Sequence, residues 1–185
     1  MYRLLLLLSM SLACLSAQAE VLRSSEQGFT VRHQVDVMML PAAAWAALVD
    51  VARWWDPAHT FSGDARNLSL DPRIGGCLCE KLGLYAGVQH MTAIYAQPPK
   101  QLRLSGALGP LQEFAVTGSM TWQIEPGGGG SRVTMTYTVG GFADRPLSEW
   151  APVVDSILTM QAERLAKLIN TGSADDAKAG VASRP

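Results

Sequence analysis

The clearest strand pattern in the chain lies near its N-terminus, where apolar and polar residues alternate from Phe29 to Val37. Three valines and His33 fall on one side of this segment, and polar residues fall on the other. Strict alternation over this length is typical of a strand that buries one face. Pro41 then opens an Ala- and Leu-rich segment, 42–51, which predicts a helix that cannot continue past Pro57.

The middle of the chain consists of short alternating segments separated by turn residues. The glycine run 127–130 joins two such segments and opens no helix, so it predicts a hairpin loop rather than a phosphate-binding loop. Turn signals at this spacing indicate one antiparallel meander. The expected strands cover residues 65–70, 76–82, 87–95, 102–108, 115–124 and 132–139.

The last expected element is a long helix over residues 149–170. At 100° per residue its apolar side chains share one face, and Gln161 falls in the middle of that face. At about 1.5 Å per residue the helix would be roughly 30 Å long, enough to cross a small sheet. The shared face consists of Trp150, Val154, Ile157, Leu158, Leu165 and Leu168.

This order of elements predicts an α+β fold in which a curved antiparallel sheet of six to seven strands wraps around the C-terminal helix. One helix cannot fill the concave side of so large a sheet. We therefore expect an apolar cavity with a few polar groups between the two.

The first residues form a separate segment. Residues 1–19 combine Arg3, an apolar run and the small-x-small sequence Ala17-Gln18-Ala19. This pattern predicts a secretory signal peptide cleaved after Ala19, and a periplasmic or secreted protein. The alternative is a lipoprotein signal with Cys14 as the lipidated residue, although Ser11 fits its first position poorly. We then expect a leader over 20–27, one domain over 28–170 and a flexible tail over 171–185.

Composition limits the classes of partner. The 185 residues are 48% hydrophobic and 17% charged, with a formal net charge of −1, which is enough apolar material for a core. The sequence contains no basic patch, so we expect no nucleic-acid partner. The apolar run at the N-terminus is too short for a membrane span. No cofactor is expected, and the sequence does not indicate an oligomeric state.

Cys77 and Cys79 would remain in the mature chain. Residues i and i+2 of a regular strand lie about 6.6 Å apart with parallel side chains, which resists a disulfide. A bulge at Gly75-Gly76 would change this geometry. Two free buried thiols are favoured over a disulfide, and a metal site is least favoured because two ligands do not complete a shell.

The order of elements resembles the helix-grip fold of the superfamily that contains START proteins, the birch-pollen allergen and polyketide cyclases, known as SRPBCC. The resemblance covers about residues 28–170. It rests on Pro41-Ala42-Ala43-Ala44-Trp45, on Gly75-Gly76, on Pro98-Pro99-Lys100-Gln101-Leu102 and on the closing helix. The segment from Trp54 to Thr60 looks like secreted bacterial members. The resemblance implies a fold more than an activity, since the superfamily shares no catalytic set.

Several polar residues are candidates for function. His33 and His90 lie on strands among apolar neighbours, where a buried structural hydrogen bond competes with a role in ligand binding or proton transfer. Glu80 faces inward if Leu78 and Leu82 do, the opposite facing leaves it in water, and a solvated or ion-paired state is favoured. The expected ligand-binding set is Trp54, His59, His90, Leu104, Tyr137, Trp150, Val154 and Gln161, with no metal ligand.

Three functions remain open. The first is binding or transport of an apolar molecule the size of a sterol, fatty acid or polyketide, without catalysis. The second is a cyclase or dehydratase in which His90 acts with Glu80 or Gln161. The third is a protein-interaction module. An apolar pocket without paired polar groups favours the carrier, and a His and Glu within hydrogen-bond reach favour the enzyme.

Overall fold

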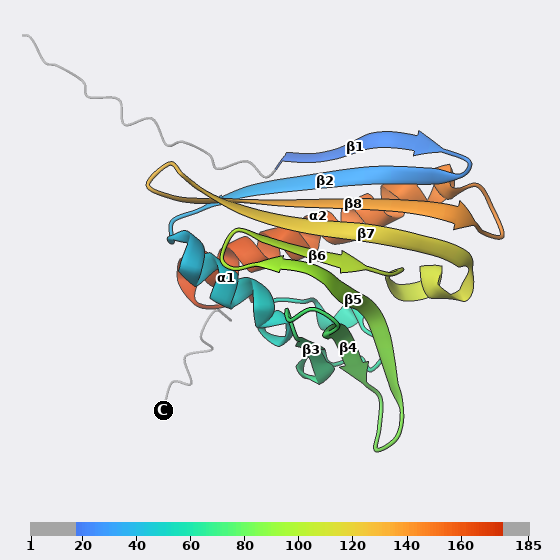
Figure 1. Cartoon of the computed structure of the whole chain (residues 1–185), viewed down its shortest axis with the longest axis horizontal. Coiled ribbons are helices and arrows are strands. Elements are labelled where there is room, and N and C mark those ends of the chain that lie inside the picture. Colours follow the sequence, from blue (N-terminus) through green and yellow to red (C-terminus); the bar gives the residue numbers. More distant parts are fainter. Residues whose placement is uncertain (1–17, 176–185) are drawn as a thin grey trace, which may run out of the picture.

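The computed structural model describes residues 18–175 and shows one curved antiparallel sheet with a long helix behind it (Figure 1). The sheet has eight strands in the order β1-β2-β8-β7-β6-β5-β4-β3. The strands are β1 (Gln18–Ser25), β2 (Gly28–Val37), β3 (Leu68–Leu70), β4 (Cys77–Lys81), β5 (Gly87–Gln97), β6 (Gln101–Ser105), β7 (Ala115–Gly127) and β8 (Gly130–Phe142).

Two α-helices and four short 3₁₀ helices complete the described chain. Helix α1 spans Pro41–Val49, and helix α2 spans Leu147–Thr171. Helix α2 ends where Gly172 takes a left-handed conformation with φ of +82° and donates its N–H to the carbonyl of Leu168. The 3₁₀ helices are η1 (Val51–Arg53), η2 (Pro57–His59), η3 (Ala65–Asn67) and η4 (Gly109–Glu113).

The predicted α+β helix-grip fold is confirmed, but the sheet has one strand more than the expected six to seven. The additional strand is β1, which lies in residues assigned to the signal peptide and the leader. It pairs with β2 from Gln18 opposite Gln34 to Ser25 opposite Gly28. The hydrophobic pattern did not predict β1, because this edge strand exposes most of its side chains and its sequence is polar.

The alternation of β2 and the hairpin at the glycine run are both confirmed. In β2, the valines and His33 are buried while Arg32 and Asp36 are exposed. Strands β7 and β8 pair up to Gly127 opposite Gly130, and Gly128 and Gly129 form the turn with φ of +58° and +83°. Two consecutive positive φ values suit the tight hairpin turns that match the twist of the strands.

Helix α2 covers only part of the sheet. It packs against β1, β2 and β8, and helix α1 packs against α2, β7 and β8. Toward the other edge of the sheet, η1 packs against β3, and η4 packs against β7 and donates a hydrogen bond from Gln112 to the carbonyl of Gln89 in β5.

The expectation of two free thiols is wrong, because Cys77 and Cys79 form a disulfide. The register between β4 and β5 shifts at Leu78 and Cys79, so β4 is not a regular strand at this point. The Cα atoms of the two cysteines lie 5.4 Å apart, which is within disulfide range and shorter than the regular spacing.

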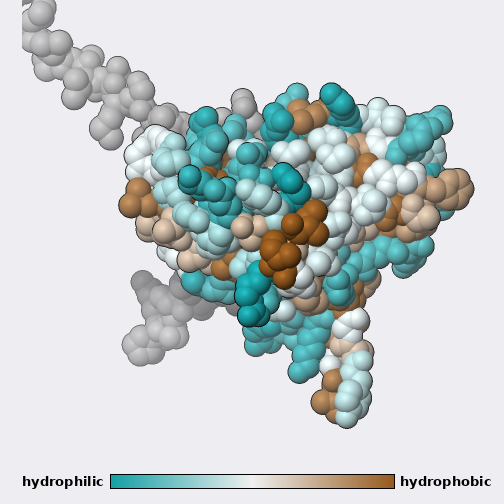
Figure 2. Space-filling model, in the orientation of Figure 1, coloured by the Kyte–Doolittle hydropathy of each residue, from teal (hydrophilic) through white to brown (hydrophobic). Residues whose placement is uncertain are grey.

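The edges of the molecule show two further features. Strands β4 and β5 continue into a hairpin that projects from the body and carries apolar residues at its tip (Figures 1 and 2), where Leu84 is 81% and Tyr85 97% exposed.

Ala174 is buried and Asp175 contacts Arg164 at 2.9 Å, so the first residues of the expected tail pack against α2. Among residues 18–175, no helix is both long and apolar enough to span a bilayer.

Candidate functional site

A cavity of about 330 Å³ lies between the N-terminal half of α2 and the β3–β5 part of the sheet. Its walls are mostly apolar, with His59, Thr60 and His90 among them. Four segments far apart in the sequence form it: residues 55–61, strands β3 to β5, residues 108–111, and α2 from Trp150 to Leu158. The lining residues are Trp55, Ala58, His59, Thr60, Phe61, Leu68, Leu78, His90, Leu108, Gly109, Pro110, Leu111, Trp150, Val153, Val154, Ile157 and Leu158.

The segment 55–61, which closes one side of the cavity, is held by hydrogen bonds from the helix. The buried Gln161 of α2 accepts a hydrogen bond from the backbone N–H of Asp56 at 2.9 Å, and its amide nitrogen lies 3.4 Å from Nδ1 of His59. The indole N–H of Trp55 donates to the carbonyl of His59 at 3.0 Å. Gln161 therefore positions the wall rather than forming it.

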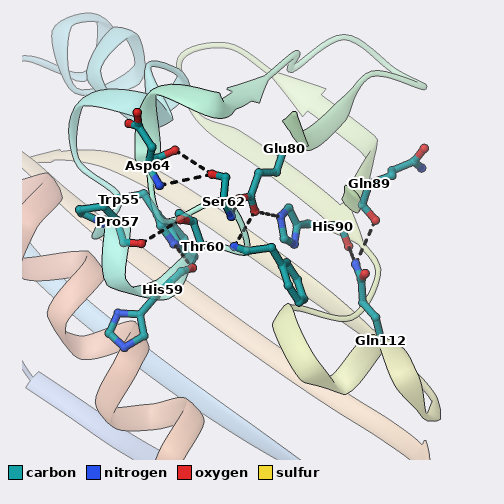
Figure 3. Close-up of polar contacts among 11 residues, drawn as sticks. Trp55, Pro57, His59, Thr60, Ser62, Asp64, Glu80, Gln89, His90 and Gln112 are labelled. Atoms are coloured by element: carbon teal, nitrogen blue, oxygen red, sulfur yellow. Dashed lines mark hydrogen bonds and ion pairs between the residues drawn. The ribbon is translucent and has the colours of Figure 1, made fainter. Parts of the chain in front are cut away.

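The other end of this segment is held by Glu80 from the sheet. Leu78 and Glu80 of β4 face inward while Cys77 and Cys79 are partly exposed, which settles the facing that the sequence left open. The carboxylate of Glu80 accepts hydrogen bonds from the backbone N–H groups of Phe61, at 3.1 Å, and Ser62. Figure 3 shows the ring of His90 directed at this carboxylate, while the hydroxyl of Ser62 bonds the backbone of Asp64.

Glu80 and His90 form a buried pair. Nε2 of His90 lies 3.1 Å from Oε2 of Glu80, and the two residues are 7% and 2% exposed. Burial acts to raise the pKa of Glu80, but the hydrogen bonds from Ser62, Phe61 and His90 outweigh burial and lower the pKa from 4.5. The carboxyl group is therefore ionised near neutral pH.

A β-bulge in β5 directs the side chain of His90 toward Glu80. Leu78 pairs with Met91 and Cys79 pairs with Gln89, so His90 is the extra residue between two positions of the ladder. His90 and Met91 are consequently both buried, although neighbours on a regular strand face opposite sides. Gln112 of η4 donates to the carbonyls of Gln89 and His90 at 3.0 and 3.4 Å, which compensates for the interrupted ladder (Figure 3).

Trp150 lies in the cavity wall on the helix side. The guanidinium of Arg145 lies 4.3 Å from the centre of one of its rings, and Phe114 contacts it edge to face. Its indole Nε1 is buried and has no hydrogen-bond partner among residues 18–175. Trp150 therefore contributes an apolar surface and one unpaired donor.

The structure separates the predicted ligand-binding residues into two groups. His59, His90, Trp150 and Val154 line the cavity. The others lie outside its lining: Leu104 is core, Trp54 donates to the carbonyl of Leu48 at 3.1 Å, and Gln161 holds residues 56–59.

Tyr137 is the fourth residue outside the lining. Its hydroxyl accepts a hydrogen bond from the N–H of Leu108 at 3.1 Å, and so it supports the segment 108–111 from behind. Burial raises the pKa of this hydroxyl, because ionisation inside the core is costly. Tyr137 and Gln161 thus act on the walls from outside the cavity.

His33 belongs to a different cluster. It lies under α2, where its Nδ1 is 3.2 Å from the hydroxyl of Thr159 and its Nε2 is 3.4 Å from Asp155. Burial lowers the pKa of His33, and the nearby Asp155 only partly opposes this effect. This cluster joins the sheet to the helix away from the cavity lining.

Sequence reasoning did not include some of the main lining residues in the site. Trp55 and Phe61 lie in a segment whose path depends on Gln161 and Glu80, and residues 108–111 lie in a loop without a periodic pattern. The consecutive aromatic residues at 54 and 55 were the available signal, but periodicity does not show which one faces the cavity. Within the described range 18–175, no cluster of three or more His, Cys, Asp or Glu residues could hold a metal ion.

Comparison with known families and structures agrees with this architecture. The sequence model of the family described as polyketide cyclase / dehydrase and lipid transport matches residues 28–170. The chain belongs to this family. No curated protein matches the chain.

Solved structures show the same fold at low sequence identity. CalU16 from Micromonospora echinospora is 12% identical with a TM-score of 0.56, and the match covers 85% of this chain and 88% of that chain. A conserved protein of unknown function from Enterococcus faecalis is 10% identical with a TM-score of 0.56 and coverages of 87% and 80%. Aha1 from Colwellia psychrerythraea, solved as a dimer, is 14% identical with a TM-score of 0.55 and coverages of 77% and 97%.

Proposed function

We propose that this protein binds and carries a hydrophobic small molecule outside the cytoplasm. The observation that carries the proposal is the apolar cavity of about 330 Å³ between α2 and the sheet. Ligand cavities commonly measure about 300–1,000 Å³ and combine apolar walls with a few polar groups. The family to which the chain belongs includes lipid transport, which supports the same function.

The extracytoplasmic location rests on two features. Residues 1–19 have the pattern of a signal peptide, although residues 1–17 lie outside the described part of the chain. The Cys77–Cys79 disulfide is of a kind that persists in oxidising compartments. Cleavage after Ala19 would remove the first two residues of β1 and leave Glu20 to Ser25 paired with β2.

A second candidate function is acid–base catalysis of the cyclase or dehydratase type, and the buried His90–Glu80 pair favours it. Two observations place it second. Both oxygens of Glu80 accept hydrogen bonds, and its lowered pKa makes it a poor base near neutral pH. Gln161, the other candidate partner, is engaged with Asp56 and His59.

The carrier function is tested by filling the cavity from the helix. Val154 lines the cavity, and Val154→Trp would occupy part of its volume. Ser156→Trp is the matched control, because Ser156 is exposed on the same helix and does not line the cavity. We expect the wild type and Ser156→Trp to bind the apolar fluorophore N-phenyl-1-naphthylamine with increased emission, and Val154→Trp to bind it at least tenfold more weakly.

Stability measurements accompany the binding test. A ligand at a hundred times its Kd adds about 2.7 kcal/mol to the free energy of unfolding of the wild type. Overpacking by Val154→Trp costs about 1–3 kcal/mol if the site is already filled by protein atoms. If the probe binds neither the wild type nor the control, and Val154→Trp is simply destabilised, the interior is a packed core and the proposal fails. If the probe does bind, native mass spectrometry of protein from its own host identifies the natural ligand.

A further inference from the structure

His90 occupies a distinctive place in the cavity wall. It is the bulged residue of β5, it lines the cavity, and it is 7% exposed. The ring of Phe61 stacks against it with centroids 5.9 Å apart and an interplanar angle of 19°. Bulges recur beside active sites, where they redirect a side chain.

The partners of Glu80 determine where the proton of the imidazole lies. An ionised carboxylate only accepts hydrogen bonds, and Glu80 is held ionised by the N–H groups of Phe61 and Ser62. Nε2 of His90, 3.1 Å from Oε2, must therefore carry a hydrogen. In the neutral ring this leaves Nδ1 with a bare lone pair.

Nδ1 of His90 is buried and has no hydrogen-bond partner within residues 18–175. The two ring nitrogens point in nearly opposite directions, so Nδ1 faces away from Glu80. An unpaired acceptor in an apolar surrounding is costly, and a ligand that supplies a donor removes that cost.

We infer that the cavity selects an apolar molecule that carries a neutral hydroxyl group, an alcohol or a phenol, whose O–H donates to Nδ1 of His90. The inference rests on the proposed function and adds the polar chemistry of the ligand. A carboxylate has no hydrogen to donate at neutral pH, and an ammonium group would be costly to transfer into walls this apolar. Glu80 is then a positioning residue: it fixes the tautomer of His90 and does not touch the ligand.

Two probes of nearly equal shape test this inference. 2-Naphthol carries the hydroxyl, and 2-methylnaphthalene replaces it with a methyl group. The measured quantity is the Kd of 2-methylnaphthalene divided by that of 2-naphthol, obtained by titration calorimetry. Comparing this ratio between variants cancels the difference in hydrophobicity between the probes.

The variants separate the two nitrogens of His90. His90→Gln can place an amide N–H near the position of Nε2, which keeps a donor for Glu80, but it has no acceptor at the position of Nδ1. His33→Gln is the matched control, because it makes the same substitution at a buried histidine that lies outside the cavity lining. We expect the ratio to fall roughly fivefold to tenfold in His90→Gln, the size of one hydrogen bond, and to stay unchanged in His33→Gln.

A measurement on the wild type covers the case in which His90→Gln does not fold. The ¹⁵N resonance of His90 Nδ1 should move on addition of 2-naphthol and stay in place with 2-methylnaphthalene. If both probes bind but neither the ratio nor the resonance responds to the hydroxyl, the inference is overturned while the carrier function stands. If the wild type binds neither probe nor N-phenyl-1-naphthylamine, the proposed function fails, and the inference fails with it.

Discussion

Replacing Glu80 by Gln removes one charge and almost no volume at the point where the sheet holds the segment 55–61. In the wild type, Oε1 accepts from the N–H of Ser62, and Oε2 accepts from the N–H of Phe61 and from Nε2 of His90. Gln has one oxygen and one NH₂ group. Whichever way the amide is turned, at least one N–H donor faces another donor.

The expected cost follows from these contacts. A hydrogen bond to a charged group contributes about 1.5–3 kcal/mol. Gln keeps one or two of the three interactions, so we expect Glu80→Gln to lower the free energy of unfolding by about 2–4 kcal/mol at pH 7. Glu163→Gln is the control, because Glu163 is exposed on α2.

Urea unfolding followed by tryptophan fluorescence measures this difference, and its pH dependence gives an independent check. The folded-state pKa of Glu80 lies below 4.5, so its stabilising contribution is fully present above about pH 4.5. It is lost as the pH falls through the folded-state pKa, and the gap between wild type and Glu80→Gln should close there. A gap below about 0.5 kcal/mol at pH 7, the size of an ordinary surface substitution, would refute an ionised Glu80 with three donors.

Two further predictions concern the disulfide and His33. Intact mass should show no alkylated thiol in the mature protein before reduction and two after it, and Cys77→Ser with Cys79→Ser should cost only about 1.5 kcal/mol because the bridge closes a very short loop. Burial places the folded-state pKa of His33 below 6.5, so its stabilising contribution is complete above that pH and is lost as the pH falls toward the folded value. The urea midpoint should therefore fall less between pH 7.5 and pH 5 in His33→Gln than in the wild type, and equal falls would contradict this account.

The sequence by itself determined the elements that have a strong period. The alternation around Val31 and Val35, the glycine hairpin, and the apolar face of the C-terminal helix each fix a local structure whose buried side is visible in the pattern. Together with the order of elements, these periods were enough for an α+β fold with a curved antiparallel sheet around a closing helix and for a cavity between the two, and the resemblance to SRPBCC proteins implied the helix-grip arrangement. Local patterns succeed here because burial of one face is a property of neighbouring residues.

Tertiary structure decided the details on which the site depends. His90 faces the cavity because of a bulge. A bulge inserts one extra residue, and the alternation of apolar and polar residues does not predict where it occurs. The same irregular register accompanies the Cys77–Cys79 disulfide, which regular strand geometry argued against. Strand β1 was missed because an exposed edge strand needs little apolar sequence.

The walls of the cavity depended most on contacts between distant segments. Residues 55–61 take their path from Gln161, about a hundred residues later, and from Glu80 on the opposite side. Such a segment has no periodic pattern of its own, since it belongs to no ladder and is anchored at both ends by hydrogen bonds to side chains. The sequence could therefore indicate that a cavity exists, but only the folded chain decides that Trp55 and Phe61 line it while Trp54 and Tyr137 do not.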